Sequence, residues 1–489
     1  MYLILLPIFF PILAGFCLLV CPKKPDRKLL IITTGICLVV TAMLILCTLL
    51  SGKQELTLFY LTRTLPIYFK IDEVGILFCL LTVVVFVGAG FFSFVYMTHE
   101  QKEKRYYGFY LMVFGVLNAL CFAGNLITFY LFFELLTLSS MPLVLHTGSR
   151  EAIMAGLKYL FYSLCGAYAG LFGIYFLYHN CDTLTFTAGG VLQTTAIAAQ
   201  GEFLLLTAFV MILGFGVKAG MFPMHAWLPT AHPVAPAPAS AVLSAVIVKA
   251  GVLALIRVIY YIFGVSFLRG SWVQTAWLIL ALVTVFMGSM LAYREPVLKK
   301  RLAYSTVSQI SYILFGLAAM NEEAFTGGLL HVLAHGLIKC TLFLTAGAII
   351  YTTGKTRVDE LRGIGKEMPL TIWCYTIVSL GLIGIPPTGG FISKWYLALG
   401  GLSGNIGVFG YIGPVVLLLS ALLTAGYLLP LTIQGFFPGA DYAYASLQKR
   451  EPHKCMTIPI LIMTILSVLI GLFPNILVDY LADFVGTLF

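Results

Sequence analysis

Residues 213–257 read LGFGVKAGMFPMHAWLPTAHPVAPAPASAVLSAVIVKAGVLALIR, with Lys218 and Lys249 inside apolar helical runs on either side of a proline-rich segment. A lysine at mid-bilayer depth is costly unless it faces water or a partner, and a proline-broken helix needs protein or water to satisfy its freed backbone groups. A lysine near a helix end can instead extend its ammonium group to the membrane surface. Long uncharged stretches on both sides of Lys249 disfavour that alternative there. We therefore expect both lysines to belong to an ion path.

The composition indicates a polytopic membrane protein. Of 489 residues, 60% are hydrophobic and only 10% are charged, which excludes a soluble protein. The first apolar run meets CPKKPDRK instead of a small-residue cleavage site, so we expect a retained span and not a signal peptide. Runs of spanning length predict an all-α protein with about 14 transmembrane helices, near residues 1–20, 29–50, 73–97, 107–123, 126–146, 153–178, 203–224, 239–263, 272–292, 301–320, 324–352, 369–398, 410–436 and 456–486.

The basic residues predict the orientation. Alternate loops, starting with the one after the first run, contain 19 lysines and arginines, whereas the opposite loops contain only Lys53, Arg63, Lys70 and Arg269. The positive-inside rule places the first set in the cytoplasm and both termini outside, in the inner (cytoplasmic) membrane of a bacterial or archaeal cell. This asymmetry accounts for most of the net charge of +9, so no nucleic-acid partner is implied. Six basic residues remain within helices: Lys158, Lys218, Lys249, Arg257, Lys339 and Lys394.

The chain contains an imperfect internal repeat. A proline/glycine break lies beside Lys218 and again beside Lys394, and an earlier helix of each copy has its own lysine, Lys158 or Lys339. Five helices per copy is an odd number, so the copies run in opposite directions through the membrane, and matching broken helices in inverted repeats indicate a mid-membrane ion site. Lys249 has no lysine counterpart in the second copy. We predict an N-terminal three-helix segment (1–106), two half-channels (107–263 and 272–436) and a C-terminal helix (456–489).

Glu134 is the one acidic residue well inside a helix. If Glu134 approaches Lys218, each charge stabilises the other, and separation leaves a desolvated lysine that releases its proton. Movement of this contact would then act as a proton switch. The alternative is a static buried ion pair that fixes helix packing.

Four histidines accompany the lysines. His225 and His232 flank the first break, while His331, His335 and Lys339 follow one another at intervals of four residues on one helical face. Such a row favours a proton relay; a metal site lacks a third ligand, and the lysine would repel a cation. His225 or His232 can also be an ordinary core histidine. Polar residues in 304–309 either hold water along the relay or join helices.

No motif indicates a cofactor in this chain. The 11 cysteines show no metal-ligand spacing, and neither a Gly-rich phosphate loop nor an HExxH motif is present. We therefore expect no cofactor-binding, metal or catalytic redox site in the chain itself.

Several motifs resemble the antiporter-like subunits shared by respiratory complex I, energy-converting membrane-bound hydrogenases and Mrp-type sodium/proton antiporters. They are FYLFFELLTLSSMPL, the segment 218–251, RLAYSTVSQISYILFG, HVLAHGLIKCTLFLTAG and GIPPTGGFISKW, spread over about residues 70–430. The resemblance implies fourteen helices, two inverted five-helix half-channels and proton translocation driven by redox chemistry in partner subunits. By motif it implies a switch pair (Glu134 and Lys218), a central relay (Lys249), a bridge (His331, His335 and Lys339) and an exit-side group (Lys394).

Within that superfamily the chain resembles the shorter members, because it lacks the extra C-terminal helices and the long lateral helix of the largest subunit. Lys394 stands where one short branch of the family has glutamate, which argues against that branch. The loop 347–369 together with PPTGGFISKW favours the hydrogenase or Mrp-type group.

Three functions follow as hypotheses. The first is a proton-translocating, or sodium-coupled, membrane subunit of a redox-driven pump such as a membrane-bound hydrogenase or NADH dehydrogenase-like complex. Its expected partners are further antiporter-like subunits and a peripheral redox arm with nickel–iron, iron–sulfur or flavin centres. The second is a subunit of an Mrp-type antiporter driven by ion gradients with no redox partner. The third, a quinone-binding enzyme subunit, is disfavoured because no aromatic-lined headgroup site stands out.

Overall fold

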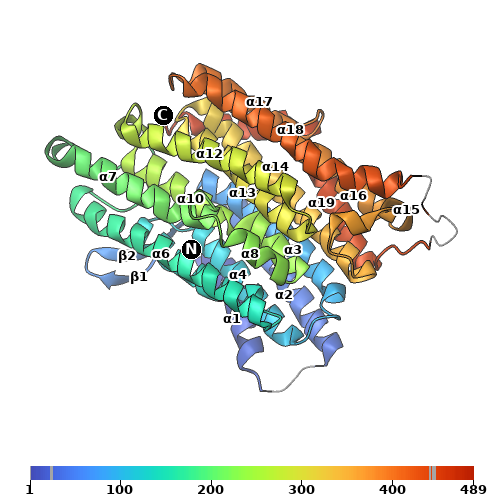
Figure 1. The fold of residues 1–489 in the computed structure, drawn as a ribbon. Helices are drawn as coiled ribbons and strands as arrows, with labels where there is room; N and C mark the ends of the chain where they lie inside the picture. Colours follow the sequence, from blue (N-terminus) through green and yellow to red (C-terminus); the bar gives the residue numbers. More distant parts are fainter. Residues whose placement is uncertain (1, 23–25, 440–441, 443–447) are drawn as a thin grey trace.

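The computed structural model describes residues 2–22, 26–439, 442 and 448–489, and these residues form a bundle of long helices (Figure 1). The N-terminal part consists of η1 (Tyr2–Leu5), α1 (Leu6–Val20), α2 (Arg27–Leu50) and α3 (Glu73–Tyr96). Helix α1 packs closely on α4 (Glu103–Cys121), because a Cβ at Gly15 would lie only 2.4 Å from the carbonyl oxygen of Gly108. Glycine is therefore required where these two helices cross.

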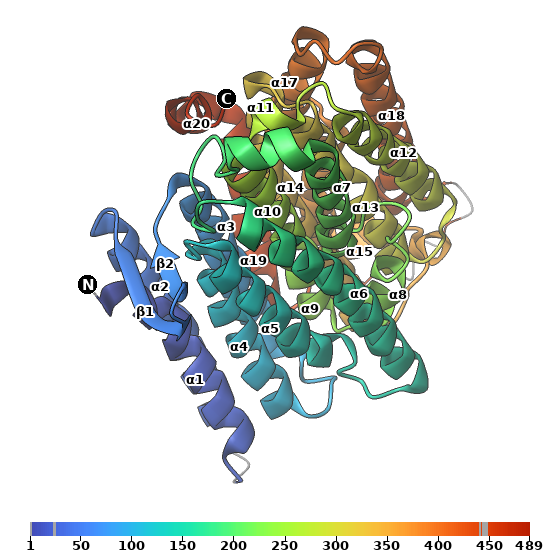
Figure 2. The ribbon, with the colours of Figure 1, turned by 90° about the vertical axis from the view of Figure 1, so that its left-hand side faces the viewer.

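An antiparallel hairpin of β1 (Glu55–Thr62) and β2 (Leu65–Lys70) connects α2 to α3, and Figure 2 shows it beside α2. The sequence treated these residues only as a polar connection, so the hairpin was not predicted. It is joined to the bundle by backbone hydrogen bonds: the Lys70 amide donates to the Phe122 carbonyl, and the Gly124 amide donates to the Tyr68 carbonyl.

The first predicted half-channel continues through a series of helices interrupted at the proline-rich segment. Its elements after α4 are α5 (Leu126–Val144), α6 (Arg150–Asn180), α7 (Thr194–Ala219), α8 (Leu228–Val234), α9 (Ala237–Val242), η2 (Leu243–Ile247), α10 (Lys249–Val258) and η3 (Ile259–Phe263). Both η2 and η3 are single π-helical turns, so α10 is bounded on each side by a local widening of the helix. Such π-turns occur often at functional sites.

The second predicted half-channel has its break between two 15-residue helices, α16 and α17. The short helix α11 (Val265–Leu268) precedes it, and its elements are α12 (Trp272–Arg294), α13 (Leu298–Ala318), α14 (Glu322–Thr353), η4 (Val358–Leu361), α15 (Ile364–Glu367), α16 (Pro369–Ile383), α17 (Gly389–Ser403) and α18 (Phe409–Phe436). The chain ends with α19 (Lys454–Leu472) and α20 (Pro474–Val485). One continuous helix over 456–489 was expected; instead the helix ends at Leu472, and Pro474 begins a new one.

Each of the predicted apolar runs coincides with a helix or a series of helices. Among the described residues, 11 helices are long and apolar enough to cross a membrane. The 11 do not include α4, α13 or the short helices α16 and α17. The chain is thus an all-α, multi-pass membrane protein; the total of fourteen crossings, the inverted repeat and the four-part division stay predictions.

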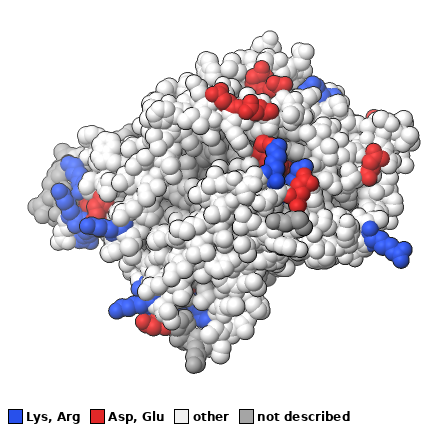
Figure 3. All heavy atoms as spheres, turned by 180° about the vertical axis from the view of Figure 1, so that it is seen from behind, with Lys and Arg blue, Asp and Glu red and all other residues white. Residues whose placement is uncertain are grey.

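Burial separates an inner from an outer set of helices. The span 237–263 is completely buried and α14 is almost completely buried, whereas α1, α2, α6 and α18 expose large apolar side chains. In the view of Figure 3, charged side chains form a few small groups and most of the surface is uncharged. Polar residues on α10 and α14 are therefore surrounded by protein and shielded from lipid, as intramembrane ionisable groups must be.

Candidate ion-translocation site

Lys218 lies in the last turn of α7, which ends at Gly220 with a φ of 74°. The side chain is buried, and its Nζ donates a hydrogen bond to Thr137 Oγ1 on α5. The same Nζ lies 5.1 Å from the ring centroid of Phe133 and 5.3 Å from that of Tyr159. The ammonium group thus has one hydroxyl acceptor and two aromatic faces around it.

Glu134 lies on α5 one turn before Thr137, so the acid and Lys218 share a neighbourhood. Glu134 is partly exposed, and its buried Oε1 has no hydrogen-bond partner within the described part of the chain. The ion pairs among described residues do not include one between Glu134 and Lys218. In the structure Lys218 is thus hydrogen-bonded to a threonine and forms no ion pair with Glu134 among the described residues; the role of the two as a switch stays a prediction.

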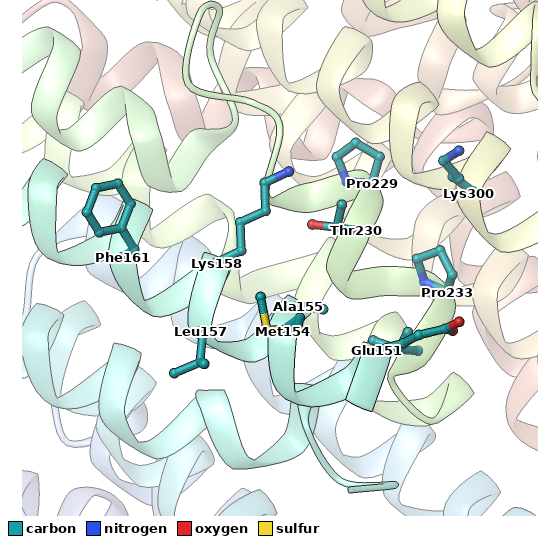
Figure 4. Close-up of a pocket in the computed structure, with 11 residues that line it drawn as sticks. Glu151, Met154, Ala155, Leu157, Lys158, Phe161, Pro229, Thr230, Pro233 and Lys300 are labelled. Atoms are coloured by element: carbon teal, nitrogen blue, oxygen red, sulfur yellow. The ribbon is translucent and has the colours of Figure 1, made fainter. Parts of the chain in front are cut away.

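Lys158 stands apart from the other lysines, in a groove of about 660 Å³ between α6, α8 and the start of α13 (Figure 4). Its side chain points toward Pro229 and Thr230, and Lys300 lies on the far side of the groove. The groove is mostly apolar and open, so Lys158 is reachable from the surface. The role of Lys158 in the ion path stays a prediction.

Lys249 begins α10 directly after the π-turn and is fully surrounded by protein. Its Nζ lies 3.0 Å from His335 Nδ1 on α14 and donates to the Ser244 carbonyl at 3.3 Å. The rings of His335 and His331 are stacked with centroids 5.7 Å apart. Lys249 and the two histidines therefore form one contact row through the buried centre.

Lys394 closes the other end of that row. Its Nζ donates to the carbonyls of Leu382 (2.6 Å) and Ile383 (2.9 Å), which end α16 at the break. It also lies 4.9 Å from the ring centroid of Tyr312, whose ring stacks on His331 at 5.6 Å. A hydrogen bond of 2.8 Å joins His331 Nδ1 to Ser393 Oγ, the residue beside Lys394. The row of contacts thus extends from Lys249 to the partly buried Lys394, with ring contacts and not hydrogen bonds between His335, His331, Tyr312 and Lys394.

Lys339 has different partners from those of the two histidines, although it shares their helix. Its Nζ donates to Ser305 Oγ at 2.7 Å and to the Leu302 carbonyl at 3.1 Å, both on α13. Ser305 Oγ is in turn 2.7 Å from the hydroxyl of Tyr427 on α18. Equal spacing in the sequence suggested a third member of the row; the contacts place Lys339 on a branch toward α13 and α18.

The histidines at the first break are separate from this row. His232 is buried, stacks on Phe343 at 4.5 Å, and has no hydrogen-bond partner on either ring nitrogen among the described residues. His225 is partly exposed and stacks on Phe222 at 6.0 Å. The outer ring nitrogens of the two α14 histidines also lack protein partners in that part of the chain. Buried polar atoms of this kind are usually satisfied by ordered water, which is also the simplest proton carrier between them.

Sequence reasoning missed one buried basic residue and the partner of another. Lys299 was assigned to a loop but lies buried in the first turn of α13, where its Nζ donates to the Pro233 carbonyl at 3.1 Å and to the Ala235 carbonyl. It thereby caps the end of α8 beside His232. Arg257 was recognised as intrahelical but had no predicted partner; it is paired with Asp72. The helix starts three residues before the predicted apolar run, and an earlier boundary would have identified Lys299.

The pKa of Glu100, in the loop between α3 and α4, is raised by burial, an effect that the nearby charge of Lys299 opposes.

Among the described residues, no group of three or more His, Cys, Asp or Glu side chains is placed to hold a metal ion. The prediction that the chain has no cofactor of its own stays a prediction.

Residues 123–428, which contain the buried row and both breaks, match the family described as NADH:quinone oxidoreductase/Mrp antiporter, transmembrane. NADH-quinone oxidoreductase subunit N of Desulforudis audaxviator is 34% identical over 384 residues, or 76% of this chain and 75% of that protein. A Na(+)/H(+) antiporter subunit of Bacillus subtilis is 28% identical over 475 residues, or 96% of this chain and 93% of that protein. A chain of the membrane-bound sulfane sulfur reductase, an archaeal respiratory membrane complex, has the same fold, with a TM-score of 0.85 and 23% identity over 100% of this chain and 98% of that one. The chain therefore belongs to the NADH:quinone oxidoreductase/Mrp antiporter transmembrane family.

Proposed function

We propose that this chain is a proton-translocating membrane subunit of a multisubunit ion pump driven by redox chemistry in partner subunits. The observation that carries the proposal is the buried row of Lys249, His335, His331 and Lys394, with Tyr312 between the last two. Burial of so many ionisable groups is costly and has no packing benefit that apolar residues would not supply better. Proton transfer along the row accounts for their presence.

The row suits stepwise transfer of one proton at a time. Lysine nitrogen and imidazole nitrogen at hydrogen-bonding distance can hold a single proton between them, and the stacked imidazoles present a second carrier beside the first. Glu134 would set the charge state of Lys218 at the start of the path by approaching or leaving it. Water at the unpaired imidazole nitrogens would complete the steps that are too long for direct transfer.

The partners would supply the driving reaction. The family includes subunits of multisubunit membrane complexes, so further membrane subunits are expected neighbours. A peripheral arm with nickel–iron, iron–sulfur or flavin centres would carry the redox chemistry, since this chain shows no motif for such a centre. We place the assembly in the cytoplasmic membrane of a bacterium or archaeon with both termini outside. Lys23 and Lys24, which contribute to that orientation, lie outside the described residues.

The test is purification of the intact assembly in mild detergent, followed by metal analysis and visible absorbance for flavin and iron–sulfur centres. The assembly is then reconstituted in liposomes with a pH-sensitive dye inside. Electron donor should produce a pH change that a Lys249→Met assembly does not produce. A complex without a redox centre, or a Lys249→Met assembly that pumps normally, would contradict the proposal.

A second candidate is a subunit of an Mrp-type sodium/proton antiporter driven by ion gradients alone, with sodium as the coupled ion. The match over 96% of this chain to the Bacillus subtilis Na(+)/H(+) antiporter protein favours it. The same liposomes separate the two functions: an imposed sodium gradient, with no electron donor, should move protons only in the antiporter.

A further inference from the structure

Arg257 is a fully buried cation that the row of proton carriers does not use. It lies on α10 about two turns beyond Lys249, toward the end of the bundle that carries the hairpin. Its Nη2 donates to Asp72 Oδ1 at 2.8 Å, and its Nη1 donates to the other oxygen of the same carboxylate. Its Cζ lies 4.9 Å from the ring centroid of Phe186 and 5.0 Å from that of Tyr261. The guanidinium is thus held by a bidentate ion pair between two aromatic rings.

The ion pair lies where several chain segments meet, at the end of the first half-channel that carries the hairpin. Asp72 follows β2 and caps α3, accepting a hydrogen bond of 2.8 Å from the Gly75 amide. Phe186 belongs to the segment between α6 and α7, and its amide donates to the Gly124 carbonyl at 3.0 Å. Several chain segments therefore meet around Arg257, at the end that the positive-inside rule places outside.

The pair also has a direction. Side-chain exposure is 0% for Arg257 and 13% for Asp72, so the positive group is on the inner side and the negative group is nearer the surface. Arginine keeps its charge at any relevant pH. A cavity of about 10 Å³, the size of a single water, lies beside Lys249 and is lined by α3 residues and by Cys121. The carbonyl oxygen of Cys121 is 2.2 Å from where a Cβ on Gly75 would be, which places this wall next to the first turn of α3.

We infer that the Arg257–Asp72 pair is the outer electrostatic barrier of the first half-channel. The pair as a whole is neutral, but its positive end is the inner one and lies on the same helix as Lys249, so it raises the energy of a proton or sodium ion that leaves Lys249 toward the hairpin end. Arginine excludes cations from other membrane pores by the same effect. The proton on Lys249 is then directed sideways to His335. Arg257 is in this view a positioning residue that sets direction; it is not a carrier. The inference rests on the proposed function, because it requires that Lys249 carry protons.

The test uses the sign of the charge. Arg257→Gln removes the positive group and leaves the carboxylate, whereas Asp72→Asn removes the negative group and leaves the arginine. Asp72→Asn keeps the side-chain volume, and Arg257→Gln shortens the side chain by two heavy atoms. Intact assemblies are reconstituted in liposomes without electron donor, and passive proton entry is followed after a potassium diffusion potential is imposed. We expect Arg257→Gln to raise the leak at least about tenfold, equal to about 1.4 kcal/mol of barrier, and Asp72→Asn to stay as tight as the wild type.

A purely structural tie between the two residues predicts the same effect for both variants. Loss of either partner would then open the same contact, so equal leaks in both variants, or no leak in either, would overturn the inference. If the single variants do not assemble, the neutral double variant Arg257→Gln/Asp72→Asn is measured: a leak supports the barrier, and a tight membrane overturns it.

Adding Lys249→Met to Arg257→Gln identifies the route of the leak. A leak that passes through Lys249 must then disappear, and a leak that persists overturns the inference. The assay needs no coupled transport, so failure of the proposed function appears separately, as a wild-type assembly that does not pump with electron donor.

Discussion

Replacement of His335 by glutamine tests the buried row most directly. Glutamine fills a similar space and can accept a hydrogen bond from Lys249, whose Nζ lies 3.0 Å from the imidazole, but it cannot carry a proton. At that distance two positive charges repel each other by about 5 kcal/mol with an effective dielectric constant near 20. Such a repulsion disfavours simultaneous protonation of the lysine and the histidine by roughly 10⁴-fold.

On the proposed path, a proton that reaches Lys249 would therefore drive the previous one from His335 toward His331, and the glutamine variant would lose this step. We expect donor-driven proton transport to fall by about 10²-fold or more, the usual contribution of a positioned proton-transfer group. The assay is initial proton uptake by liposomes at equal assembly content, checked by gel filtration of the complex. His335→Gln should then behave like Lys394→Met.

Lys339→Met is the matched comparison, because it removes a lysine from the same helix. The side chain of Lys339 contacts Ser305 and Leu302 and not the two histidines. It should retain more transport than His335→Gln. If His335→Gln pumps at the wild-type rate, the row through the two histidines is not the path. If Lys339→Met is instead the more severe variant, protons pass through Lys339, as the bridge predicted from the sequence requires.

Other variants probe the predicted switch, the second break and the loop between α3 and α4. Lys218→Ala should abolish proton transport without loss of assembly, and Glu134→Gln should slow proton transport strongly. The double variant should be no worse than Lys218→Ala; transport assays on all three variants measure this. Gly390→Ala should lower the melting temperature, because the new Cβ would lie 1.9 Å from a carbonyl oxygen of α16, whereas the control Gly201→Ala meets no atom within 4 Å and should be tolerated. Burial raises the pKa of Glu100, so the folded state binds its proton more tightly and stability decreases as pH rises through that raised pKa. Glu100→Gln should flatten this decrease in thermal unfolding measured between pH 4 and pH 8.

The sequence by itself predicted the helices and the breaks, because both depend on local composition. Apolar runs of spanning length correspond to the helices of the bundle, and the proline and glycine clusters beside Lys218 and Lys394 interrupt them as expected. A bilayer restricts a chain of this composition to helices, so hydropathy was enough. The hairpin at 55–70 was missed because its signal, a short alternation outside the apolar runs, was weak beside that of the helices.

Which ionisable groups touch each other was decided only by the tertiary structure. Helical spacing put Lys339 on the face of His331 and His335, but contacts depend on which neighbouring helix each long side chain reaches, and Lys339 reaches α13 while His335 reaches α10. Likewise, Arg257 and Asp72 are separated by 185 positions, and nothing in either local sequence indicates the other. Hydrophobic burial is encoded residue by residue along the chain, whereas a buried charge is stabilised by a partner that only the packing of distant helices supplies.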